Sequence, residues 1–231
     1  MKIELCAASI EAINFAKKYN FDRIELCQNL EQGGLTPSDG LIQFAIEKGL
    51  STHVLIRVRP GGFVYSYEEV EVMLSDIKRC VQLGVDGIVI GALTVNGEID
   101  IDVIKQMISC AKNLEVTFHR AFDVVPKPKE ALVEVIKMGV GRLLTSGQKE
   151  KAEDGIDLLS ELQKMAQNKL IVMPGSGINH LNSSLFKTAG FTEIHSSASK
   201  TTSRNTHSFF GNTPQTVSDT KTIKNMLDTI A

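Results

Sequence analysis

Two cysteines occupy matching positions in two similar segments near the N-terminus. Cys6 ends the run I-E-L-C, and Cys27 ends R-I-E-L-C. If these runs are neighbouring strands, about 5 Å apart, the two thiols lie close together. Such thiolates could bind a soft ion linearly and favour monovalent copper, whereas zinc would need two more ligands, for which His119 or His195 could serve. The alternative is a pair of core thiols, and the spacing does not decide between them.

Histidines and arginines follow other short apolar runs. His119 lies in T-F-H-R-A-F-D, His195 in E-I-H-S-S, and Arg57 and Arg59 in R-V-R-P-G-G-F. A histidine at the end of a strand can act as an acid or base, and an arginine pair can bind a carboxylate or phosphate. These residues favour an enzyme for a small anionic or phosphorylated metabolite, with His119 or His195 in proton transfer and Arg59 binding the anion. The arginines could equally neutralise buried acids.

Two loops rich in glycine and serine could also bind an anion. P-G-S-G-I-N, at 174–179, follows a strand-like run and precedes a helical one, and H-S-S-A-S-K, at 195–200, follows the last strand-like run. Backbone amides and a helix N-terminus in such loops often bind a phosphate in barrel enzymes. The alternative is a pair of tight turns. The predicted anion site comprises Arg57, Gly175, Ser176, Gly177, Ser197 and Ala198.

The order of elements predicts how these residues are positioned. Eight strand-like runs alternate with amphipathic stretches, which lie at 9–18, 38–48, 67–83, 100–111, 128–138, 151–166, 179–188 and 218–230. This alternation, without a linker, favours an α/β fold, a single-domain (β/α)8 TIM barrel over residues 1–231, rather than an open doubly wound sheet. We expect 199–217 to be an irregular loop. Helix caps are predicted at Ser9, Ser38, Asp100 and Ser218, and helix ends at Gly49, Gly84, Gly139 and Gly190.

Alternation along each strand sorts side chains between the barrel interior and the helices. The apolar residues must face the helices, so the polar ones face inward: Glu4, Cys6, Glu25, Cys27, His53, Arg57, Arg59, Thr117, His119, Glu193 and His195. Buried charges need partners, and we expect the three interior glutamates to pair with Arg57, Arg59 and, as a further candidate, Arg120. The cysteines and histidines should then surround the end of the barrel where active sites form.

Composition narrows the kind of partner. The 231 residues carry 25 basic and 27 acidic side chains, a net charge of −2, without a basic patch for nucleic acid or an anionic membrane. The N-terminus does not resemble a signal peptide or an anchor, so we expect a cytoplasmic protein with free thiols. Its partner should be a small molecule or ion.

Several motifs together resemble the CutC family of copper homeostasis proteins. They are A-S-I-E-A, F-D-R-I-E-L-C-Q-N-L-E-Q-G-G-L-T-P-S, F-V-Y-S, D-G-I-V-I-G-A-L-T, T-F-H-R-A-F-D, R-L-L-T-S-G and I-V-M-P-G-S-G-I-N. The resemblance extends from residue 1 to about 200. It implies a TIM barrel, a cytoplasmic homodimer or higher homo-oligomer, and copper(I) bound at Cys6 and Cys27.

The chain departs from the family pattern in three places. R-V-R-P-G-G-F lacks the acid that usually precedes Phe63, a glycine triplet is replaced by Gly175-Ser176-Gly177, and the last strand ends in H-S-S-A-S rather than in a basic residue. The first change removes any role for an acid in that loop. The family's biochemical activity is unsettled, so the resemblance does not decide whether the protein is an enzyme.

Overall fold

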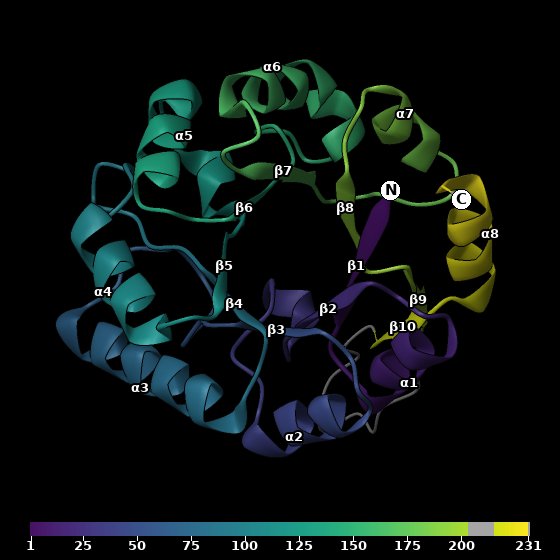
Figure 1. Cartoon of the computed structure of the whole chain (residues 1–231), viewed down its shortest axis with the longest axis horizontal. Helices are drawn as coiled ribbons and strands as arrows, with labels where there is room; N and C mark the ends of the chain where they lie inside the picture. The colour runs from purple at the N-terminus through teal and green to yellow at the C-terminus, as the bar shows by residue number, and fades with distance from the viewer. Residues whose placement is uncertain (203–214, 231) are drawn as a thin grey trace.

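Eight parallel strands form the central barrel of the computed structural model, which describes residues 1–202 and 215–230 (Figure 1). Their order is β7-β6-β5-β4-β3-β2-β1-β8, and a parallel bridge between Gly175 and His195 brings the two edges together. The strands are β1 (Lys2–Ala7), β2 (Arg23–Leu26), β3 (Thr52–Leu55), β4 (Gly87–Ile90), β5 (Glu115–Phe118), β6 (Arg142–Thr145), β7 (Ile171–Pro174) and β8 (Glu193–Ser196). The predicted (β/α)8 TIM barrel is confirmed.

Helices surround the barrel on its outside (Figure 1). They are α1 (Ile10–Lys18), α2 (Asp39–Glu47), α3 (Tyr67–Leu83), α4 (Ile101–Ala111), α5 (Pro128–Lys137), α6 (Ile156–Ala166), α7 (Ser183–Thr188) and α8 (Thr220–Ile230). Short 3-10 turns η1 (Leu30–Gln32), η2 (Arg120–Val124) and η3 (Ala152–Gly155) lie in the loops. None of the helices in the described ranges is both long and apolar enough to cross a membrane.

The segment after β8 differs from the expected irregular loop. β9 (Ser199–Thr202) pairs antiparallel with β10 (Gln215–Ser218), so both ends of 199–217 are strands, and the rest of that prediction lies outside the described residues. Ser218 therefore belongs to a strand, and the residue that directly precedes the last helix is Asp219. Asp219 occupies the capping position instead and accepts hydrogen bonds from the backbone N–H and hydroxyl of Thr222.

The other helix signals agree with the structure. Ser9, Ser38 and Asp100 each accept a hydrogen bond from a backbone N–H in the first turn of the following helix. Gly49, Gly84, Gly139 and Gly190 all have positive φ, the conformation that a glycine after a helix adopts without steric cost. These local preferences fix where each helix begins and ends, and so where each loop over the barrel starts.

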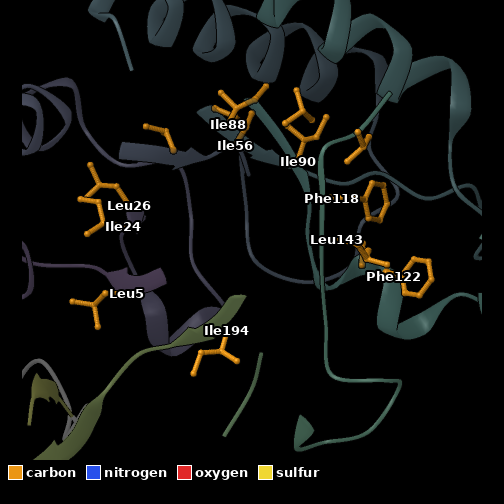
Figure 2. Packing of buried hydrophobic residues seen from close by; sticks show 14 of the residues in the cluster. Leu5, Ile24, Leu26, Ile56, Ile88, Ile90, Phe118, Phe122, Leu143 and Ile194 are labelled. Carbon is orange, nitrogen blue, oxygen red and sulfur yellow. The ribbon is translucent and has the colours of Figure 1, made fainter. Parts of the chain in front are cut away.

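The main apolar core lies between the barrel and its helices, not inside the barrel. Figure 2 shows Leu5, Ile24, Ile88 and Phe118 among the side chains packed on the outer face of the strands, and all four have no exposed surface. Because neighbours along a strand point to opposite faces, burying these residues outward directs the alternate, polar side chains into the barrel. The interior is therefore free to hold the polar groups described next.

Candidate functional site

A cavity of about 730 Å³ opens at the carboxyl ends of the strands. Most residues predicted for the site line it: Cys6, Cys27, Arg57, His119, Ser176, Gly177, His195, Ser197 and Ala198. Arg59 and Gly175 do not. We call this space the mouth cavity.

The two cysteines meet at one wall of the mouth cavity. β1 and β2 are paired, and the Cys27 backbone N–H donates to the Ala7 carbonyl at 3.0 Å, which brings the two Sγ atoms to 3.8 Å. Leu55 and Val89 form an apolar cluster with them. The hydrogen bond to Cys27 and burial, together with the nearby carboxylates, raise the pKa of Cys6 well above its ordinary value.

A carboxylate and an imidazole lie beside Cys6. One ligand atom from each of Cys6, Glu25 and His195 falls within 4.8 Å of the others. His195 Nδ1 lies 2.8 Å from a Glu4 oxygen, and its Nε2 lies 3.4 Å from a Glu25 oxygen. A carboxylate that accepts from Nδ1–H leaves Nε2 as the ligand atom of an imidazole, an arrangement frequent at metal centres.

The surroundings shift the pKa values of Glu25, Glu4 and His195 in different directions. Burial raises the pKa of Glu25 to about 7, and the charge of Glu4 adds to this while His195 opposes it. Burial would also raise the pKa of Glu4, but hydrogen bonds and charges from His195 and Arg23 lower it to about 2. Burial would lower the pKa of His195, yet its hydrogen bond to Glu4 and the charges of both glutamates raise it. Glu4 therefore keeps its negative charge beside His195 and Arg23, whereas burial disfavours the charge of Glu25.

Below the mouth, arginines from two strand starts neutralise the interior acids. Arg23 donates to Glu4 at 2.5 Å and to Glu193 at 2.7 Å. Arg142 donates to the same Glu193 oxygen at 2.7 Å and to Glu115 at 3.0 Å. Arg23 shares its strand face with Glu25 and Arg142 shares its strand face with Leu144, so the sequence signal was present, although our prediction overlooked both arginines.

The predicted pairing of Arg57, Arg59 and Arg120 with the interior glutamates is wrong. Arg59 lies beyond the end of β3, where strand alternation no longer applies, and it forms an ion pair with Glu69 in the first turn of α3. Arg120 forms an ion pair with Asp123 in η2 at 2.7 Å. Arg59 therefore points away from the barrel and is not placed to hold an anion in the mouth cavity.

Arg57 and His119 do point inward, toward the mouth cavity. The Arg57 guanidinium donates to the backbone carbonyls of Gln32, Gly34 and Gly61 at 2.7–2.9 Å. His119 Nδ1 accepts the backbone N–H of Ala121 at 3.1 Å. Burial, followed by the charge of Arg57, lowers the pKa of His119 to about 3, so this imidazole is neutral at physiological pH.

The glycine–serine loops after β7 and β8 offer fewer free backbone amides to an anion than predicted. The Gly175 amide donates to the Thr145 carbonyl at 3.0 Å, and the Ala198 amide donates to the Ser196 hydroxyl at 3.1 Å. The Ser176 hydroxyl donates to the Glu150 carbonyl. The expected helix N-terminus is also displaced, since α7 begins only at residue 183. Two of the predicted amides are thus already engaged.

Comparison with known proteins agrees with this architecture. The CutC family model matches residues 1–200. The chain belongs to the CutC family. The family protein CutC of Pasteurella multocida is 45% identical over 197 residues, which cover 84% of this chain and 81% of that protein. The family protein CutC of Bacteroides thetaiotaomicron is 44% identical over 200 residues, covering 85% and 80%.

A solved CutC structure has the same fold. The Streptococcus agalactiae protein, described as a candidate copper homeostasis protein CutC, is 35% identical to this chain and superposes with a TM-score of 0.81. The match covers 85% of this chain and 98% of that chain. Family membership and the barrel are therefore shown for this chain.

Sequence reasoning also missed two apolar residues of the mouth cavity, Phe63 and Leu144, whereas strand alternation does place Leu55 inward. Phe63, from the loop between β3 and α3, lines the cavity and packs on His119, with ring centroids 5.0 Å apart. Leu55 and Leu144 line the cavity from inside β3 and β6. The inward direction of Leu144 could have been read from the same alternation, but the position of Phe63 depends on the loop conformation and could not.

Proposed function

We propose that this CutC-family protein binds copper(I) at the barrel mouth through Cys6 and Cys27. The observation that carries the proposal is the 3.8 Å distance between the two buried Sγ atoms. Thiolates are soft ligands that select monovalent copper among the available metals, and an apolar surrounding limits access of water to the ion. The name of the Streptococcus agalactiae relative supports a role in copper homeostasis.

The spacing of the two sulfur atoms favours a bent arrangement around the ion. Two metal–sulfur bonds of about 2.3 Å placed in line would span about 4.6 Å, more than the 3.8 Å between the two Sγ atoms. A bent two-sulfur arrangement fits this separation. His195, whose ring is oriented by Glu4, groups with Cys6 and Glu25 but not with Cys27, so a third bond from His195 to the same ion would require a small movement. His119 fits this role poorly, because its Nδ1 accepts a backbone N–H and its Nε2 therefore carries the proton.

An enzyme acting on a phosphorylated metabolite remains the alternative hypothesis. The loops after β7 and β8 support this hypothesis less well, because the Gly175 and Ala198 amides already donate hydrogen bonds within the protein. Arg59, expected to hold the anion, pairs with Glu69 instead. The cytoplasmic location and the homo-oligomeric state stay predictions.

Copper(I) titration under anaerobic, reducing conditions tests the proposal. The wild-type protein should take up one equivalent in competition with a colorimetric copper(I) chelator, and Cys27→Ser should abolish this uptake. Cys110→Ser is the matched control, because Cys110 lies in α4 and its thiol donates to the Leu74 carbonyl. Copper uptake that is the same in Cys27→Ser as in the wild type would refute the proposal.

A further inference from the structure

The Arg57 guanidinium carries a buried charge without an acidic partner. Arg57 is 5% exposed, and its guanidinium donates to the backbone carbonyls of Gln32, Gly34 and Gly61. No carboxylate in the described ranges pairs with it, and residues 203–214 contain no Asp or Glu. Its Nε has no hydrogen bond of good geometry among the described residues; the buried Tyr65 hydroxyl, also without one, lies near enough to interact with the guanidinium. A buried cation with an unused donor is costly unless an anion joins it.

A second unused donor belongs to His119. Because Nδ1 accepts the Ala121 N–H at 3.1 Å, it carries no proton, and the neutral ring must carry its proton on Nε2. This Nε2–H is buried and has no partner within the described part of the chain. The charge of Arg57 contributes to keeping His119 neutral, which indicates that the two side chains interact electrostatically.

The Phe63 side chain contacts both groups. Its ring centroid lies 5.3 Å from Arg57 Cζ and 5.0 Å from the His119 ring centroid, and Phe63 also lines the mouth cavity. The Phe63 carbonyl accepts the Leu93 N–H at 2.8 Å, so its backbone is anchored while the side chain is held by packing alone. Cation–π contact offsets part of the unpaired charge of Arg57 but supplies no hydrogen-bond acceptor.

We propose that Arg57 Nε–H and His119 Nε2–H form a binding site for the carboxylate of a small organic acid, uncovered when the Phe63 side chain rotates. A carboxylate supplies the negative charge and the two acceptor oxygens that these donors lack. Leu30, Leu55 and Ile178 line the same cavity, which suits a short carbon chain on the acid. The site shares the mouth cavity with the cysteine pair, but it does not rest on copper binding.

Matched acid and amide probes test the site. Butyrate and benzoate should bind in titration calorimetry and shift the imidazole ¹⁵N resonances of His119, whereas butyramide and benzamide, which have similar shapes but no charge, should not. Loss of one hydrogen bond to a charged ligand weakens binding about 10-fold to 100-fold, and we expect this loss in His119→Phe. Phe63→Ala removes the cover without removing a donor and should bind the acids several-fold more tightly.

The controls separate this site from the copper site. Cys27→Ser should retain acid binding within about twofold, since the cysteine contributes neither donor. The inference is overturned if neither acid binds the wild type or Phe63→Ala at concentrations of about 10 mM, or if His119→Phe, shown to be folded by circular dichroism, binds them as the wild type does. Equal affinity in Phe63→Ala and the wild type would overturn the covering role of Phe63.

Discussion

The free energy of unfolding should decrease as the pH is lowered, and His119 is one cause. This side chain is 5% exposed, and burial together with the charge of Arg57 lowers its pKa to about 3 in the folded protein. In the unfolded chain a histidine has a pKa of about 6.5. Between these two values the unfolded state binds more protons than the folded state. The contribution of neutral His119 is therefore complete above about pH 6.5 and is lost as the pH falls toward 3.

The expected size of the effect follows from the two pKa values. A pH of 4.5 is about two units below the pKa of the unfolded histidine. This difference corresponds to about 2.7 kcal/mol of lost stability at pH 4.5, against about 0.2 kcal/mol at pH 7. The difference of about 2.5 kcal/mol depends mainly on the unfolded-state value, since the folded imidazole is still mostly neutral at pH 4.5.

Urea denaturation of the wild type and His119→Gln at about pH 7 and pH 4.5 measures this difference. The acid-induced loss in free energy of unfolding should be about 2.5 kcal/mol smaller in the variant, because the other titrating groups are common to both proteins. Phe63→Leu is the control, since it alters the packing on His119 but keeps the imidazole. Acid losses that agree within about 0.5 kcal/mol between wild type and His119→Gln would refute the reasoning.

Two further changes test the interior of the barrel. Gly91→Ala places a Cβ into the imidazole of His119, so it should destabilise the protein by about 1–3 kcal/mol in urea denaturation and shift the His119 ring resonances; an unchanged ring spectrum would contradict the contact. Glu193→Met leaves Arg23 and Arg142 without the oxygen that they share and should cost about 3–5 kcal/mol in the same assay. A cost below about 1 kcal/mol would show that the shared carboxylate is not essential.

Most of the site could be predicted from alternation along the strands. Cys6 and Cys27 follow strongly apolar strand patterns, and His119 and His195 continue the inward face of their strands. Where the outward residues must be buried against helices, a shift of register by one residue would expose the whole apolar face. This constraint fixed the direction of these four side chains, so a single sequence was enough to place them around the mouth cavity.

The same rule could not be extended past the strand ends. β3 ends at residue 55, so Arg59 belongs to a loop whose path depends on the Pro-Gly-Gly turn and on capping of α3 by Ser66. The loops after β7 and β8 raise a similar difficulty. Ser176 and Ala198 both have positive φ, which is uncommon for residues other than glycine and is set by tertiary contacts rather than local preference. The directions of their backbone amides therefore could not be predicted from the sequence.

The polar network at the base of the barrel contributes to the chemistry of the mouth cavity. Glu4 accepts from Arg23 through one oxygen, at 2.5 Å, and contacts His195 Nδ1 through the other, at 2.8 Å. Arg23 thereby holds the carboxylate that orients the imidazole beside Cys6. Without this ion pair the pKa of Glu4 would rise, because burial would then be opposed by His195 alone, and the carboxylate that fixes which His195 nitrogen faces Cys6 would be held less firmly. The arginine at the start of β2 is thus a positioning residue for the proposed metal site.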